Sequence, residues 1–315
     1  MGARALRRAR HPPVRARGGQ RLSALKKIAP WAVTLAIFAF LFSRYPIGQV
    51  VETLAAGRWG LYLLLIVPYS AFYLLVDTLV LQQAVSWFLV RVPYRDVLPV
   101  RATAYILSLV NTQLGQGGIA VYLHRRHHIP FWQVTGVVVF IALVEIYQLA
   151  FYSFVGAAVS NEPKAPWEVY AVMAAYLAAH LWFFSRPRRG RIGEMAIFRA
   201  FFQAKLWQYP ALLLLKTPNL LAAVLINWLA LPLFGIDIPL VTLLTFLPLV
   251  YFFAALPIAA AHLGPSQAAW VYFFGAYAPG EKLIAYSLAA HLMFMVTNAF
   301  WGLLFLRRAS RELSG

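Results

Sequence analysis

The sequence predicts an all-α polytopic integral membrane protein, with about six transmembrane helices and two re-entrant hairpins in inverted-topology repeats. Hydrophobic residues make up 62% of the chain and charged residues only 12%, whereas soluble domains have about 45–50% and about 25%. The apolar residues form long runs, such as 61–76, 137–158 and 283–306. Runs of about 20 residues match a hydrocarbon core of about 30 Å. Two interruptions, at 111–118 and 256–264, divide this apolar sequence.

The placement of the basic residues predicts the topology. The chain has 28 Lys and Arg against 10 Asp and Glu, a net charge of +18. With a cytoplasmic N-terminus, 24 of the 28 fall in cytoplasmic segments, and the exceptions are Arg44, Arg58, Lys164 and Lys282. This asymmetry follows the positive-inside rule, so the charge requires no nucleic-acid partner. We therefore expect a multi-pass protein of the cell (inner) membrane with both termini cytoplasmic.

The N-terminal part divides into a tail and the first two crossings. Residues 1–27 are rich in Arg and Pro and predict a basic cytoplasmic tail, and 28–306 predict a single transmembrane domain. The apolar stretch 28–43 lacks a convincing small-residue cleavage site, so we interpret it as an uncleaved signal anchor that runs outward. An amphipathic stretch at 46–58 should lie outside, and 59–88 should return to the cytoplasm.

The first interruption predicts a re-entrant hairpin. After a cytoplasmic loop at 91–101, residues 102–114 are too short to span the membrane. Gly115, Gly117 and Gly118 should break the helix, because glycine is unfavourable in helix interiors. The basic run 124–128 follows only six residues after Gly118. A segment that enters from the cytoplasm and returns to it fits this spacing better than a full crossing.

The remaining segments predict a second, inverted repeat. We expect crossings at 131–159, 166–185, 218–235 and 281–306, and an interfacial helix at 193–216. Residues 240–257 should enter from outside, 257–264 should interrupt, and 265–278 should return outside. The two repeats, about 59–160 and about 193–306, would then have opposite orientations, and 307–315 would form a short cytoplasmic tail. Broken helices at corresponding points of such repeats indicate a transport site near the bilayer midplane.

The ionisable residues of the predicted crossings that are candidates for a functional role are Asp77, Glu145 and His291. Glu145 and His291 each follow the last glycine of an interruption by 27 residues. A charge at the bilayer centre costs about 2.5–3.5 kcal/mol on insertion scales. Glu145 should therefore face the interior and be paired or protonated, as a headgroup or proton site or as a structural hydrogen bond. His291 is either a titrating donor or a neutral core residue. Asp77 raises the same question, and it could simply pair with a loop arginine.

Polar and glycine residues at the interruptions complete the candidate substrate-binding set. The guanidinium forks of Arg125 and Arg126 could bind a lipid phosphate, or belong to an ordinary positive-inside loop. The glycines either expose amides to an anionic headgroup or allow close helix packing. Neighbouring polar residues, Gln116 among them, favour a lined cavity. The candidates are Asn111, Gln113, Gly115, Gly117, Gly118, Arg125, Arg126, Glu145, His262, Gly264, Ser266, Gln267 and His291.

No catalytic, metal-binding or cofactor-binding residue is predicted. The chain has no cysteine, which excludes thiolate nucleophiles and Cys-based metal sites. His124, His127 and His128 have no carboxylate nearby in the sequence, so a metal site is not favoured. No nucleophile elbow or phosphate-binding loop occurs.

The two interruptions carry a resemblance to a known family. The segments Asn111-Thr112-Gln113-Leu114-Gly115-Gln116-Gly117-Gly118, Arg125-Arg126, Glu145, Leu256-Pro257-Ile258 and Leu263-Gly264 resemble motifs of the transmembrane flippase-domain family of lysylphosphatidylglycerol synthases. The similarity covers about residues 30–306 and resembles stand-alone members, some linked to hopanoid or glycolipid pathways. Several charged family positions are replaced here, by Ile119, Ile146, Ser266-Gln267 and His291. The resemblance implies lipid transport without lipid aminoacylation, because no synthase domain follows.

The leading functional expectation is a lipid flippase or transporter that passes a polar headgroup through a midplane cavity. The alternatives are a membrane-embedded lipid-modifying enzyme, for glycosyl or phosphoryl transfer, and a scaffold of a lipid-synthesis complex. Few carboxylates are available for catalysis, which disfavours the enzyme. The expected partners are membrane lipids, a phospholipid or glycolipid, with a homo-oligomer or a lipid-synthesis partner also open. No cofactor is expected.

Overall fold

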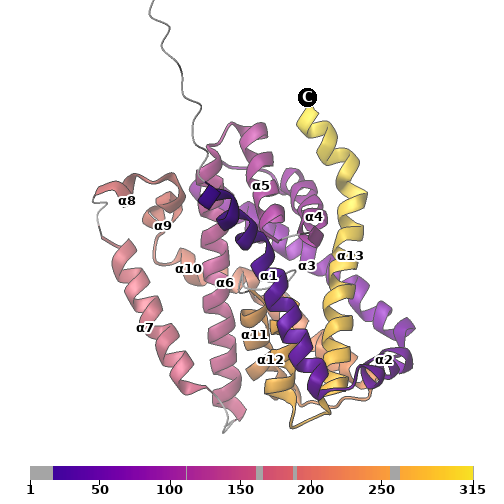
Figure 1. The fold of residues 1–315 in the computed structure, drawn as a ribbon. Helices are drawn as coiled ribbons and strands as arrows, with labels where there is room; N and C mark the ends of the chain where they lie inside the picture. Colours follow the sequence, from indigo (N-terminus) through magenta and orange to yellow (C-terminus); the bar gives the residue numbers. More distant parts are fainter. Residues whose placement is uncertain (1–16, 111, 161–165, 187–189, 256–262, 315) are drawn as a thin grey trace, which may run out of the picture.

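The protein is helical throughout its described residues (Figure 1). The computed structural model describes residues 17–110, 112–160, 166–186, 190–255 and 263–314, with the side chains of 17–30, 110, 112, 113, 190, 191 and 312–314 left out. The helices are α1 (Arg17–Arg44), α2 (Ile47–Ala56), α3 (Trp59–Phe88), α4 (Tyr94–Val110), α5 (Thr112–His127), α6 (Phe131–Ser160), α7 (Trp167–Phe184), α8 (Gly190–Glu194), η1 (Ala196–Phe198), α9 (Arg199–Gln203), α10 (Gln208–Ala230), η2 (Leu231–Phe234), α11 (Leu240–Ala255), α12 (Pro265–Phe274) and α13 (Gly280–Ser314).

Several of these helices are long and apolar enough to cross a membrane. Within the described ranges there are four: α3, α6, α10 continued by η2, and α13. A fifth would be the bent pair of α1 from Trp31 and α2, whose axes meet at 89°. At about 1.5 Å per residue, the 30 residues of α3 and of α6 exceed the thickness of a hydrocarbon core. The protein is therefore a multi-pass membrane protein by composition and helix length.

The boundaries of the most apolar helices agree with the sequence. The predicted crossing 59–88 is α3, and the predicted crossing 131–159 is α6 with one further residue. The 89° turn after Arg44 separates α1 from α2, as expected for a crossing followed by an amphipathic surface helix. The predicted crossing 166–185 corresponds to α7, whose 18 residues include Glu168 and His180. It is not among the four long apolar helices.

The predicted boundary between the interfacial helix 193–216 and the crossing 218–235 is wrong. The helix α10 begins ten residues earlier, at Gln208, and continues through Pro218. Lys216 is consequently a buried residue of this helix, with 5% of its surface exposed. The membrane segment tolerates the cation because Glu145 lies beside it. A paired charge costs far less in an apolar interior than an isolated one.

The two ends of the helix bundle differ in charge. In Figure 1 the C-terminus, the end of α5, α8 and α9 lie toward the upper end, whereas α2 and the turn from α12 to α13 lie at the lower end. The end of α5 carries Arg125 and Arg126, and the C-terminal part of α13 carries Arg307. Arg308 donates to the carbonyl of Arg95 at 3.0 Å, which brings the start of α4 to this end as well. The basic segments therefore gather at one end.

Two long helices each pack closely on a helix from the other half of the chain. The helix α6 packs on α11, and α13 packs on α4. Both crossings include a glycine that meets backbone: a Cβ on Gly156 would lie 2.6 Å from the nitrogen of Thr245, and one on Gly302 would lie 2.6 Å from the carbonyl oxygen of Ala102. Small residues allow such close approach of helices in membranes. The two halves of the chain therefore pack closely against each other at two helix crossings.

The predicted helix break at Gly115–Gly118 is wrong. Helix α5 runs without interruption from Thr112 to His127 and contains all three glycines. A Cβ on Gly118 would lie 2.6 Å from Cδ1 of Leu107, and one on Gly115 would lie 2.8 Å from the carbonyl oxygen of Ala104. These two glycines therefore bring α5 close to α4. Of the two interpretations of the glycines, exposed amides or close helix packing, the contacts of Gly115 and Gly118 agree with close packing. Helix α4 ends at Val110 and α5 begins at Thr112, and Asn111 is outside the described residues.

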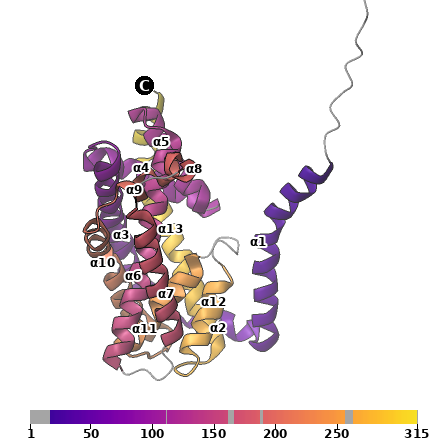
Figure 2. The ribbon, with the colours of Figure 1, turned by 90° about the vertical axis from the view of Figure 1, so that its left-hand side faces the viewer.

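The second interruption separates two helices as expected. Helix α11 ends at Ala255 and α12 begins at Pro265, with residues 256–262 outside the described part. Gly264 caps α12 with a φ of 96°, a left-handed value that side chains rarely adopt. The side chain of Ile37 in α1 lies beside it, 3.3 Å from where a Cβ would be. Figure 2 shows α1 at the periphery, apart from most of the bundle.

Two of the three clusters of buried apolar residues in the described part of the chain share α3. One cluster joins Tyr62 and Ile66 of α3 to α11, α12 and the end of α10. The other joins the later part of α3, from Val80 to Phe88, to α4, α5 and α6. The stretch of α3 between the clusters carries Asp77, a buried carboxylate. The polar site described next lies beside this stretch.

Candidate functional site

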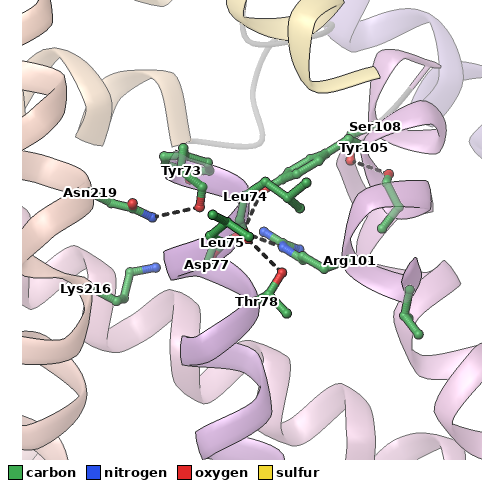
Figure 3. A network of polar contacts seen from close by, with 12 residues as sticks. Tyr73, Leu74, Leu75, Asp77, Thr78, Arg101, Tyr105, Ser108, Lys216 and Asn219 are labelled. Atoms are coloured by element: carbon green, nitrogen blue, oxygen red, sulfur yellow. Dashed lines mark hydrogen bonds and ion pairs between the residues drawn. The ribbon is translucent and has the colours of Figure 1, made fainter. Parts of the chain in front are cut away.

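A polar cavity lies among five helices, α3, α4, α5, α6 and α10. Figure 3 shows part of it, with Arg101 and Lys216 on either side of the α3 segment that carries Asp77. Apolar side chains form the remainder of the wall. The lining residues are Asp77, Val80, Leu81, Arg101, Gln116, Val138, Ile141, Ala142, Glu145 and Lys216. Four of these ten residues are charged, and they form two ion pairs, Asp77 with Arg101 and Glu145 with Lys216.

The first charge pair joins α3 to α4. The guanidinium Nε of Arg101 donates to Oδ2 of Asp77. The hydroxyl of Tyr105, one turn later in α4, donates to the same oxygen at 2.7 Å. The guanidinium also lies over the Tyr105 ring, 5.0 Å from its centre. Both charged side chains are nearly buried, at 5% and 15% exposure. The two charges of this pair are thus satisfied by each other and nearly buried, and the pair links α4 to α3.

The second charge pair joins α6 to α10 across 71 residues of sequence. The ammonium Nζ of Lys216 donates to Oε2 of Glu145 at 2.9 Å. Glu145 occupies the middle of the 30-residue α6. The lysine side chain is only 6% exposed, whereas the glutamate side chain is 42% exposed. Glu145 therefore offers carboxylate surface to the cavity, in contrast to Asp77.

Near this pair, Asn219 extends the polar lining of α10. Its Nδ2 donates to the carbonyl oxygen of Tyr73 in α3 at 3.3 Å, as Figure 3 shows. Its Oδ1 is buried and has no hydrogen-bond partner among the described residues. Buried polar atoms are nearly always hydrogen-bonded. A further hydrogen-bond donor at the α3–α10 contact would therefore be stabilised by this oxygen.

Two residues of this site were assigned elsewhere by sequence reasoning. Arg101 is not part of a cytoplasmic loop 91–101 but lies in α4, where it pairs with Asp77. Lys216 is not interfacial but lies in α10. The pairing of Asp77 with an arginine from the predicted loop is confirmed, as is the pairing of Glu145. A useful signal was available: two carboxylates in apolar helices require two nearby cations.

The structure brings few of the other predicted residues to the cavity. Gln116 of α5 lines it, and Gly117 next to it has nothing within 4 Å of where a Cβ would be. Gly115 and Gly118 instead contact α4. Asn111 and His262 lie outside the described residues, and so does the side chain of Gln113.

The predicted residues of the second half have mainly structural contacts. The Oε1 of Gln267 accepts a hydrogen bond from the backbone N–H of Gly264 at 2.7 Å, which caps α12. Ser266 and Gln267 are both buried. His291 lies in α13 and is partly buried, and it is not among the residues that line the cavity. The lining of this cavity therefore includes Glu145 but not His291 among the described residues.

The basic run at the end of α5 lies at the surface. Arg125 and Arg126 are exposed, and neither belongs to an ion pair among the described side chains. Nδ1 of His124 is 2.6 Å from the carbonyl oxygen of Ile129, a contact that closes the turn into α6. Burial and the neighbouring Arg126 guanidinium lower the pKa of His127. At neutral pH His127 therefore contributes little positive charge to this run.

The chain matches no protein-family model, and no curated protein sequence matches it significantly.

Proposed function

We propose that this protein moves the polar headgroup of a membrane lipid across the bilayer, as a flippase-like transporter, through the cavity around Glu145. The observation that carries the proposal is the Glu145–Lys216 pair at mid-helix, buried on the lysine side and open to a cavity on the glutamate side. Ionisable residues within membrane helices that line a cavity are typical of substrate pathways. The resemblance of the glycine motifs to flippase domains supports the same function.

An inverted repeat is part of this proposal. Gly302 follows Gly156 by 146 residues, the same spacing that separates Gly118 from Gly264 and Glu145 from His291. The α6–α11 and α4–α13 crossings would then be equivalent under the repeat. The helix pairs α4–α5 and α11–α12 would be re-entrant hairpins that enter from opposite faces. Such repeats permit alternating access by motion of one unit against the other.

The test of transport is a vesicle assay with headgroup-labelled lipid and purified protein. Glu145→Gln should lower the transport rate about tenfold or more, the equivalent of about 1.4 kcal/mol or more, because the cavity loses its accessible carboxylate. Glu168→Gln, on an exposed turn of α7, is the matched control and should leave the rate unchanged.

A second variant separates transport from folding. Glu145→Gln leaves Lys216 as a buried cation without a carboxylate, which by itself could destabilise the protein. The double variant Glu145→Gln/Lys216→Met removes both charges and should fold, yet transport slowly. Wild-type transport by the folded double variant would contradict the proposal. Chemical conversion of the lipid in the same vesicles, detected by mass spectrometry, would instead favour a lipid-modifying enzyme.

In the proposed orientation the protein spans an inner membrane, and both termini and the basic end of the bundle lie on the cytoplasmic side. The sequence contains no cysteine, so single introduced thiols can be mapped directly. Arg126→Cys, at the exposed end of α5, should react with an impermeant maleimide only after the membrane has been permeabilised so that the reagent reaches the cytoplasmic side. Lys282→Cys, at the start of α13, should react from outside. Labelling of both positions from the same face would contradict the inverted arrangement.

A further inference from the structure

The charges that line the Glu145 cavity restrict the cargo, and this inference rests on the proposed transport function. In the described part of the chain the cavity is lined by two carboxylates and two cations, so its formal charge is zero. A neutral cargo leaves this balance intact, whereas a cargo with a net charge adds an uncompensated charge beside the buried Lys216 side chain. Burying such a charge is costly. The cavity therefore favours a headgroup with no net charge.

The accessible carboxylate adds a requirement for an N–H donor. Among the described residues Lys216 donates to Oε2 of Glu145 and to no other acceptor, and 42% of the glutamate side chain is exposed. A primary ammonium on the cargo can donate hydrogen bonds to this carboxylate, and charge-assisted bonds of this kind are about twice as strong as neutral ones. A quaternary ammonium has the same charge but no N–H to donate. The geometry thus discriminates between two kinds of zwitterion.

The lysine supplies the complementary group for a phosphate. Its ammonium has three N–H donors, and among the described residues one of them is used, by Glu145. An arriving phosphate can accept from Lys216 while the cargo's ammonium donates to Glu145. The internal pair is then replaced by two external pairs, and no charge is left without a partner during the exchange. Asp77 and Arg101 remain paired with each other during this exchange, and the Tyr105 hydroxyl remains hydrogen-bonded to Asp77.

The position of the charge pair limits the size of the headgroup. Nζ of Lys216 and Oε2 of Glu145 lie 2.9 Å apart, so the phosphate and the amine of one cargo can reach both groups only when few bonds separate them. We infer that the cavity selects a compact zwitterionic headgroup that carries one phosphate and one primary amine, as in phosphoethanolamine. The acyl chains would remain in the hydrocarbon phase.

The test compares four lipids with identical acyl chains in vesicles that contain the purified protein. Their headgroups are phosphoethanolamine, phosphocholine, phosphoglycerol and a single neutral hexose. We expect transport of the phosphoethanolamine lipid to be at least tenfold faster than that of the phosphoglycerol lipid, with the phosphocholine lipid in between. Equal rates for all four, or a preference for phosphoglycerol or hexose, would overturn the inference but leave the transport function standing. No transport of any lipid would overturn the transport function itself.

A variant identifies the residue responsible for the preference. Glu145→Gln should bring the phosphoethanolamine rate close to the phosphocholine rate, because the carboxylate that distinguishes a primary from a quaternary ammonium is gone. Lys205→Met, on an exposed lysine that precedes α10, is the control and should keep the wild-type order of rates. An unchanged preference in Glu145→Gln would overturn the assignment to this carboxylate.

Discussion

Removing either partner of the Asp77–Arg101 pair should lower the free energy of unfolding by about 3–5 kcal/mol, because the remaining buried charge loses its counter-charge. Asp77→Leu leaves the Arg101 guanidinium 15% exposed with no carboxylate beside it, and Arg101→Met leaves the Asp77 carboxylate at 5% exposure. The measurement is equilibrium unfolding in detergent, followed by circular dichroism. Loss of only a few tenths of a kcal/mol in both variants would show that the pair is solvated.

The double variant and a surface pair complete this experiment. Asp77→Leu/Arg101→Met removes both charges and should be clearly more stable than either single variant, because well-packed apolar residues can replace a buried ion pair at little cost. Asp96 and Arg308 form the matched control, with a 3.9 Å separation and 25% and 48% exposure of their side chains. Breaking this exposed pair should cost about 1 kcal/mol or less.

Gly156→Ala and Gly302→Ala should each destabilise the protein by about 1–3 kcal/mol, the usual cost of overpacking a core. In both cases the added methyl group would meet backbone at 2.6 Å, so the neighbouring helix has to move as a whole. The two effects should be similar, because the two crossings have the same construction. Equilibrium unfolding in detergent provides the measurement.

The matched control for these glycines is Gly60 in α3. It is exposed, and nothing lies within 4 Å of where its Cβ would be. Gly60→Ala should be neutral or stabilise the protein by about 0.4–1 kcal/mol through the unfolded state. If Gly156→Ala behaved like Gly60→Ala, the close approach of α6 to α11 would not matter for stability.

The sequence alone determined the membrane class and the extent of the most apolar helices. The bounds of α3 and α6 agree with prediction within one residue, because hydropathy over a window of about 20 residues measures directly what the bilayer requires. The sequence also identified Asp77 and Glu145 as residues that need partners, since an isolated charge is too costly at that depth. The separation of α11 from α12 before Gly264 followed from local chemistry in the same way.

Only the tertiary structure decided which cations serve these carboxylates. Arg101 lies 24 residues from Asp77 and Lys216 lies 71 residues from Glu145, so no local pattern joins them. Each cation was assigned to a cytoplasmic or interfacial segment because hydropathy treats every Lys or Arg as a residue that must reach water. The free energy of a buried charge depends instead on its neighbours in space. The glycines of α5 give the same result: their intrinsic tendency to break a helix is smaller than the gain from packing that helix against α4.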